Sequence, residues 1–161
     1  MMIFTALPSA KFIMKRSILW TPIIGLYAKR LECVPVDRGK RGAAIAKMVQ
    51  DVEAGRANPG QLIIYSQGTR VAPGVKAPYK VGTAVLYEQL EQPCVPVATN
   101  VGVLWPRTGV RRTPGLAVVE FLPAIAPGME KDAFLAHLED VVETKSDALM
   151  REVGFDPDGL H

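Results

Sequence analysis

Cysteine and histidine are scarce in this sequence, with two of each among 161 residues. Two thiols are too few for a disulfide framework, and neither lies in a Cys-x-x-Cys pair or near a histidine, so no metal site is expected. Cys33 and Cys94 each open a Cys-Val-Pro-Val tetrapeptide. We interpret both tetrapeptides as buried strands in which cysteine serves as a small apolar residue, which agrees with a reducing cytoplasmic setting.

Long hydrophobic runs are also absent. No apolar run reaches the roughly 18 to 20 residues that a membrane-spanning helix needs, so we expect a chain that does not cross a bilayer. The first ten residues lack the basic and apolar regions of a signal peptide. With neither a P-loop nor a dinucleotide-binding fingerprint, kinase and dehydrogenase functions have no support. The length and the 48% hydrophobic and 22% charged fractions predict one globular domain over residues 1–161.

Basic charge is concentrated in the first part of the chain. Residues 1–41 carry a net charge of +6, whereas the remaining 120 residues carry −3. Large apolar side chains are interleaved with these basic residues, a pattern that suits an anionic membrane surface or an anionic ligand. The same pattern also fits a solvated basic face beside a core helix. Nucleic acid is not an expected partner, because the basic residues form no dense runs and no nucleic-acid-binding signature is present.

Short apolar stretches alternate with stretches of helical spacing. Strands are predicted at 11–14, 33–36, 62–65, 95–99 and 117–122. Helices are predicted at 17–31, 42–55, 81–90 and 129–153, the first as one or two short helices around Pro22. This alternation is typical of an α/β domain with a mostly parallel central sheet flanked by helices, in which ligands bind beyond the carboxyl ends of the strands.

Polar residues follow three of the predicted strands, at 37–39, 66–70 and 99–100. Asp37 and Arg38, at the first of these ends, form either a local ion pair of little energetic value or a pair that presents the arginine to a phosphate.

The segment Ser66-Gln67-Gly68-Thr69-Arg70 is the most distinctive of the three strand ends. Gly68 permits a tight turn or a close approach of the backbone to a ligand. Backbone N–H groups, the Thr69 hydroxyl and the Arg70 guanidinium can together bind an oxyanion or a phosphate. The same segment also fits an ordinary strand-to-helix turn with an arginine at the surface.

Ser66 is a weak candidate for a catalytic nucleophile. The residues around it lack the first glycine of the hydrolase nucleophile elbow. The histidines that could serve as its base are His137, on a predicted amphipathic helix, and His161. A Ser-His hydrolase is therefore disfavoured.

Four segments in register resemble blocks of one enzyme family. Residues 67–70, Gln-Gly-Thr-Arg after an apolar strand, resemble the Phe-Pro-Glu-Gly-Thr-Arg block of the glycerolipid acyltransferases, most closely of the 1-acyl-sn-glycerol-3-phosphate acyltransferase (lysophosphatidate acyltransferase) family. Residues 12–22 resemble the segment before the family's second block, 34–38 (Val-Pro-Val-Asp-Arg) that second block, and 95–97 (Val-Pro-Val) the fourth. The resemblance covers about residues 4–153.

This resemblance implies an α/β acyltransferase of phospholipid biosynthesis at the cytoplasmic face of the membrane. Such an enzyme transfers a fatty acyl group from acyl-CoA or acyl carrier protein to the free hydroxyl of a lysophospholipid. It implies no cofactor apart from the acyl donor. The expected partners are the lysophospholipid, the donor, including acyl carrier protein, and the membrane surface.

Carried over to matching positions, the resemblance assigns the phosphate of lysophosphatidate to Gly68, Thr69 and Arg70, with Arg38 as a second contact and Lys15 as a third. The supporting residues of these motifs are Asp37, Ser66 and Gln67. The chain departs from the family at one of them, since Gln67 keeps the shape of the usual glutamate and loses its charge.

The larger departure is the missing catalytic block, His-x4-Asp, in which the histidine takes the proton of the acceptor hydroxyl and the aspartate orients it. No histidine of this chain has an aspartate five residues later, and Met1 falls where the block should just have ended. We therefore expect an acyltransferase-like domain that lacks its N-terminal part, through a misassigned start codon, a cloning boundary or a genuine truncation. Its catalytic residues are expected to be absent and its acyl transfer at most marginal.

Two other hypotheses stay open. The chain can be a catalytically dead module that keeps the phosphate site at a membrane surface, or a fragment that is completed by a partner. Loss of a segment that packs on the sheet would expose apolar surface, so we expect poor solubility or membrane association. The expected location is the cytoplasmic face of the membrane, with the chain peripheral or anchored by the missing segment.

Overall fold

The computed structural model divides into two compact units, Met1–Tyr65 (unit 1) and Ser66–His161 (unit 2). The expectation of one domain over 1–161 stays a prediction. The structure describes residues 7, 9–31, 33–36, 42–43, 46–47, 50, 59–106 and 112–159.

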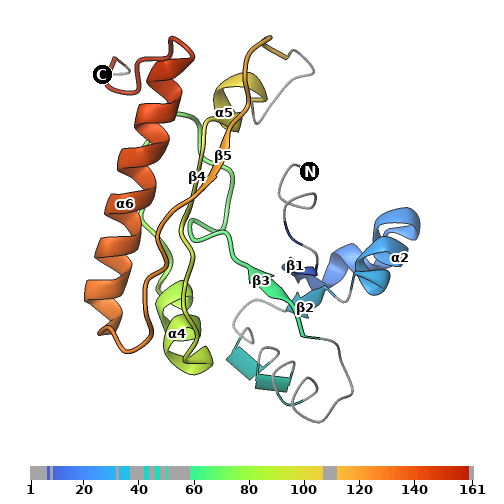
Figure 1. Cartoon of the computed structure of the whole chain (residues 1–161). Helices are drawn as coiled ribbons and strands as arrows, with labels where there is room; N and C mark the ends of the chain where they lie inside the picture. Colours follow the sequence, from blue (N-terminus) through green and yellow to red (C-terminus); the bar gives the residue numbers. More distant parts are fainter. Residues whose placement is uncertain are drawn as a thin grey trace. The chain divides into compact units, whose positions relative to one another are not determined.

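Unit 1 contains a three-stranded parallel sheet in the order β2-β1-β3 (Figure 1). The central strand β1 (Ala10–Lys15) pairs on one side with β2 (Val34–Val36) and on the other with β3 (Gln61–Ile63). The strands predicted at 11–14, 33–36 and 62–65 are therefore confirmed, and so is their parallel arrangement. In the sequence, the carboxyl end of β2 precedes the polar segment predicted at 37–39, and the carboxyl end of β3 precedes the one predicted at 66–70.

The segment predicted as one or two short helices around Pro22 forms two. A 3-10 helix, η1 (Arg16–Trp20), is followed by α2 (Pro22–Arg30), with Pro22 in the first turn, where the missing N–H costs no hydrogen bond. The two helices approach closely at Gly25, where an added Cβ would lie 2.1 Å from the carbonyl oxygen of Leu19. Glycine at this position therefore permits the packing of α2 on η1.

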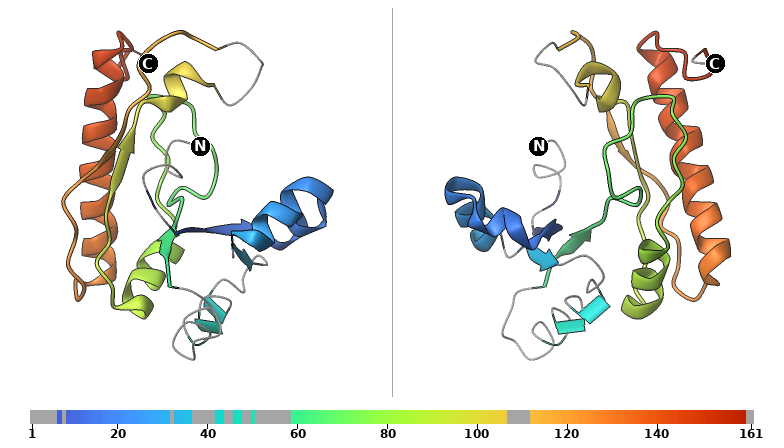
Figure 2. Two further views of the ribbon diagram at one scale, coloured as in Figure 1. Left: turned by 45° about the vertical axis from the view of Figure 1, so that its right-hand side comes forward. Right: turned by 180° about the vertical axis from the view of Figure 1, so that it is seen from behind.

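Unit 2 consists of one long helix packed along a short antiparallel strand pair (Figures 1 and 2). In chain order its elements are α4 (Val81–Leu90), β4 (Val97–Thr99), α5 (Val101–Leu104), β5 (Val119–Phe121) and α6 (Lys131–Glu152). The helices predicted at 81–90 and 129–153 and the strands predicted at 95–99 and 117–122 are confirmed.

The strand pair β4–β5 departs from the expected parallel arrangement. The strands run in opposite directions, with Val97 opposite Phe121 and Thr99 opposite Val119. A parallel pair needs a long crossover connection, usually a helix. The helix described between these strands, α5, has only four residues and was not predicted from the sequence. No crossover helix is present among the residues described between the two strands (100–106 and 112–118), and β5 runs alongside β4 in the antiparallel sense.

The core of unit 2 is aromatic at its centre. The rings of Tyr87 on α4 and Phe134 on α6 stack with centroids 3.8 Å apart and planes inclined by 4°. Ala84, Ile125 and Leu138 complete this buried cluster. Glu130 caps α6, since its carboxylate accepts hydrogen bonds from the first backbone N–H groups of the helix at 2.9 and 3.1 Å. The core and the cap fix the position of α6, which contributes to the candidate site.

Two further predictions, the helix at 42–55 and the paired Cys-Val-Pro-Val strands, have a mixed outcome. The helix predicted at 42–55 lies mostly outside the described residues. The first Cys-Val-Pro-Val tetrapeptide leads into β2 as expected, but in the second Cys94 makes only an isolated bridge with Ile125 before β4 begins. Cys33 and Cys94 are half-buried free thiols, and burial raises the pKa of the Cys94 thiol.

Candidate functional site

The predicted phosphate-binding segment forms a tight turn at the start of a closed loop. The loop spans residues 66–80, and the backbone N–H of Lys80 donates a 2.8 Å hydrogen bond to the carbonyl oxygen of Ser66, which joins its two ends. Gly68 adopts φ +68°, in the left-handed region. The glycine is therefore used as the sequence predicts, for a turn that other residues enter only with strain.

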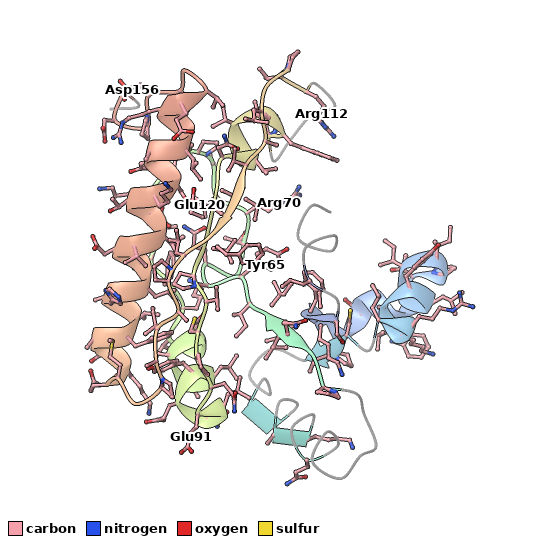
Figure 3. All side chains as sticks on the ribbon, viewed as in Figure 1. Tyr65, Arg70, Glu91, Arg112, Glu120 and Asp156 are labelled. Carbon is pink, nitrogen blue, oxygen red and sulfur yellow. The ribbon has the colours of Figure 1, made fainter. Side chains whose placement is uncertain are left out.

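Gly68, Thr69 and Arg70 are exposed along this turn. An added Cβ at Gly68 would have only Lys80 Cγ near it, at 3.6 Å, so the backbone conformation rather than crowding requires glycine. Arg70 is labelled on this loop in Figure 3. The turn thus offers a hydroxyl and a guanidinium at the surface, next to a backbone that can approach a ligand closely.

The two ends of the 66–80 loop meet one carboxylate oxygen of α6. Tyr79 donates a 2.8 Å hydrogen bond from its hydroxyl to Oε1 of Glu143, and Gln67 Nε2 lies 3.5 Å from the same oxygen. Neither Tyr79 nor Glu143 was predicted from the sequence to be part of the site. The only signal in the sequence was the spacing of Glu139, Glu143 and Asp147, since like charges four residues apart on a helix destabilise it unless other groups compensate.

Burial dominates the electrostatics of this contact. It raises the pKa of Tyr79 well above the ordinary range, and the hydrogen bond to Glu143 and the charge of that carboxylate raise it further. Burial also raises the pKa of the Glu143 carboxyl, and Asp147 and Glu139 add to this effect, while the Tyr79 hydrogen bond and Lys76 oppose it. The phenol therefore stays protonated and acts as the donor.

An open hollow of about 210 Å³ lies beside Glu143. Its lining residues are Lys76, Ala77, Glu139, Asp140, Glu143, Thr144 and Asp147. The carboxylates outnumber the one lysine, so the hollow disfavours a phosphate. Among the described residues, no group of three or more His, Cys, Asp or Glu side chains is arranged to hold a metal ion.

The other predicted site residues belong to unit 1. Lys15 ends β1, where its backbone is in register with Val36, and its side chain lies outside the described part of the chain. Asp37 and Arg38 also lie outside the described residues. The structure therefore brings Ser66, Gln67 and the three exposed turn residues together, while the contributions of Lys15, Asp37 and Arg38 stay predictions.

The polar residues at the third predicted strand end, 99–100, make hydrogen bonds within the protein. Asn100 is fully buried, and its side chain accepts from Val118 N at 2.8 Å and donates to the carbonyl oxygens of Leu116 and Leu149 at 3.1 and 3.2 Å. Thr99 donates its hydroxyl to the carbonyl oxygen of Val118 at 2.8 Å. These side chains join β4, the segment before β5 and α6, so their hydrogen bonds are made within the protein.

His137, one of the two bases considered for Ser66, is exposed on α6, and His161 lies outside the described residues. Over the described part of the chain, none of the helices has the length and apolarity that crossing a membrane requires.

Comparison with known proteins shows which family the chain is similar to. A family model described as "Acyltransferase" matches residues 1–100. The chain is 25% identical over 141 residues to a 1-acyl-sn-glycerol-3-phosphate acyltransferase of Pseudomonas aeruginosa, covering 88% of this chain and 55% of that protein. A protein of the same name from Saccharomyces cerevisiae is 28% identical over 155 residues, covering 93% of this chain and 50% of that protein.

A solved structure supports the fold. The crystal structure of the 1-acyl-sn-glycerophosphate (LPA) acyltransferase PlsC from Thermotoga maritima superposes with a TM-score of 0.71 at 21% identity, over 88% of this chain and 57% of that one. The chain thus spans about half the length of the relatives that it matches.

Proposed function

This chain belongs to the acyltransferase family, and we propose that it carries the acceptor-binding part of a 1-acyl-sn-glycerol-3-phosphate acyltransferase of phospholipid biosynthesis. The reaction transfers a fatty acyl group from acyl-CoA or acyl carrier protein to the free hydroxyl of lysophosphatidate. The names of the curated relatives support this substrate.

The observation that carries the proposal is the turn at 66–70. Its glycine holds φ +68°, the Lys80–Ser66 hydrogen bond closes the loop behind it, and Thr69 and Arg70 are exposed beside it. A phosphate monoester presents anionic oxygens that accept charge-assisted hydrogen bonds from a guanidinium, a hydroxyl and backbone N–H groups. By resemblance, Arg38 and Lys15 add further cationic contacts.

The role of these residues is to bind and orient the acceptor. In the reaction, the acceptor hydroxyl attacks the carbonyl carbon of the thioester, the C–O bond of the new ester forms, the C–S bond breaks and the thiolate leaves. The hydroxyl proton passes to a general base, which returns it to the thiolate. Fixing the phosphate places the hydroxyl for attack, a positional contribution that is separate from the proton transfer.

Calorimetric titration with a short-chain lysophosphatidate, below its micelle concentration, tests the proposal. We expect Arg70→Ala to weaken binding by about 1–3 kcal/mol, because it removes a charge-assisted hydrogen bond. Arg151→Ala is the matched control, since Arg151 is an exposed arginine of the same unit that pairs with Asp158 at 2.7 Å. Equal affinities of the parent and Arg70→Ala would contradict the proposed phosphate site.

A second candidate function is binding to an anionic membrane surface. The apolar side chains of η1, of α2 and of the residue that follows α2 support it, because six of them are between 42 and 85% exposed: Trp20, Ile23, Ile24, Leu26, Tyr27 and Leu31. Lys29 and Arg30 lie in the last turn of α2. An exposed apolar helix face next to cations suits a lipid surface with negative headgroups, such as the cytoplasmic face of a membrane.

Co-flotation with lipid vesicles tests this second function. We expect the chain to float with vesicles that contain phosphatidylserine and to bind neutral phosphatidylcholine vesicles more weakly. Changing both Lys29 and Arg30 to glutamate should weaken binding to the phosphatidylserine vesicles. The expected loss is at least about 1 kcal/mol for each cation removed. The same two changes at Lys145 and Arg151 on α6 serve as the control. Equal flotation with both vesicle types would contradict electrostatic binding.

A further inference from the structure

We propose that Glu143 is a positioning residue for the phosphate-binding turn, holding both ends of the 66–80 loop through one carboxylate oxygen, and that this contact is the reason for glutamine at position 67. The inference rests on the proposed function in that it assigns a role toward the lysophosphatidate phosphate.

The geometry of the contact carries the first part of this proposal. Gln67 stands immediately before Gly68, and Tyr79 stands at the other end of the loop, immediately before Lys80. Both side chains reach Oε1 of Glu143, at 3.5 and 2.8 Å. Because the Lys80–Ser66 backbone bond joins the same two ends, the turn is fixed to α6 from both sides.

The rigidity of α6 makes it a suitable support. Glu143 lies near the middle of this 22-residue helix, away from its frayed ends. The helix is packed against α4 through Phe134 and against the strand pair, and Asn100 is bonded to it at Leu149. A side chain anchored on such an element is held more accurately than one anchored on another loop.

The charge of the contact explains the residue at position 67. The amide of Gln67 can donate to the Glu143 carboxylate, whereas a glutamate there could only accept. Two carboxylates around one site repel, which disfavours the charged form of each. Burial already raises the pKa of the Glu143 carboxyl, and Asp147 and Glu139 raise it further, while the Tyr79 hydrogen bond and Lys76 oppose this. A third neighbouring carboxylate would therefore destabilise the turn, and glutamine avoids it.

A reciprocal exchange of the two side chains tests this inference. Gln67→Glu places two carboxylates together. Glu143→Gln alone keeps a carbonyl oxygen that can accept from Tyr79 and Gln67. The double variant restores one amide and one carboxylate, with their positions exchanged. Glu152→Gln is the matched control, because it makes the same change at an exposed glutamate of α6 that does not line the hollow beside Glu143.

Two measurements are made on each variant at neutral pH. Binding of the short-chain lysophosphatidate is measured by calorimetry, and hydrogen exchange of the 66–80 segment is measured by mass spectrometry without ligand. We expect Gln67→Glu to bind about three- to thirtyfold more weakly and to exchange faster in this segment, and the double variant to return to within about threefold of the parent. Glu152→Gln should match the parent in both.

The outcomes separate this inference from the proposed function. A double variant as weak as Gln67→Glu, or a Gln67→Glu variant equal to the parent in both binding and exchange, would overturn the role of Glu143. If Arg70→Ala and the parent bind equally, the phosphate site itself is wrong. The ligand-free exchange pattern then decides the Glu143 contact, since rescue in the double variant supports it and absence of rescue overturns it.

Discussion

The hydroxyl of Tyr79 donates a 2.8 Å hydrogen bond to the carboxylate of Glu143, a residue 64 positions away in the sequence. The bond joins the end of the 66–80 loop to the middle of α6. Burial and the neighbouring carboxylate both raise the pKa of the phenol, so it remains a donor across the physiological range. Since Gln67 reaches the same oxygen, this bond bears on the position of the whole turn.

Tyr79 should make the stability of the protein depend on alkaline pH. The pKa of its phenol is raised in the folded state above the value of about 10 that an unfolded chain has. The stabilisation is therefore fully present below pH 10 and is lost as the pH rises from there through the raised folded value. We expect the free energy of unfolding of the parent to approach that of Tyr79→Phe above pH 10, as measured by guanidinium unfolding between pH 8 and 11. Tyr27→Phe is the control, because this variant keeps Tyr79 and should therefore lose stability in parallel with the parent as the pH rises.

Gly68→Ala should destabilise the turn through the backbone alone. The left-handed φ of +68° costs a residue with a Cβ about 1–2 kcal/mol, whereas the nearest contact of that Cβ, at 3.6 Å, is an ordinary one. Gly68→Asn is the matched comparison, because asparagine enters this region more readily. Equilibrium unfolding should place the asparagine variant between the parent and the alanine variant. A stable alanine variant with unchanged lysophosphatidate affinity would contradict the requirement for glycine.

Asn100→Ala should destabilise unit 2 strongly. The substitution removes three hydrogen bonds and leaves one partly buried backbone N–H and two carbonyl groups, of which that of Leu149 is in a buried contact, without the Asn100 side chain as a partner. Each such group costs about 1–3 kcal/mol, and we expect a total loss of about 2–5 kcal/mol in the free energy of unfolding. Gln92→Ala removes an exposed amide and should change it by less than about 0.5 kcal/mol. Equal losses for the two variants would show that Asn100 does not join these elements.

The 161-residue chain should show at most marginal acyl transfer. No His-x4-Asp occurs in its sequence, and a general base contributes about 10²- to 10⁴-fold to the rate. The assay supplies lysophosphatidate and an acyl-CoA and follows the release of the thiol. A homologue that contains His-x4-Asp is the positive control. Comparable turnover of the two proteins would contradict this expectation and require another base.

Local patterns in the sequence predicted most elements of the fold. The three parallel strands of unit 1 could be predicted because each is a short apolar run bounded by turn or polar residues. The helices α4 and α6 followed from their spacing of apolar residues, and Pro22 divided the segment before it into η1 and α2. Residues 66–70 were recognisable because a glycine between polar residues after a strand has a local, steric meaning.

Contacts between distant residues were decided only by the tertiary structure. The sequence marked Asn100 as a residue at a possible ligand edge, but its three bonds within the protein give it a structural role. The antiparallel direction of β4 and β5 was also decided by the fold, because a short apolar strand pattern does not specify the direction in which the strand pairs. Glu143 carried no motif of its own, since a carboxylate on a helix is ordinary until a phenol and an amide from residues more than 60 positions away converge on it. The sequence by itself determined which segment can bind a phosphate, because backbone conformation and side-chain chemistry are local properties. Only the folded chain determined what holds that segment in place, because burial and long-range hydrogen bonds exist only after the elements have packed.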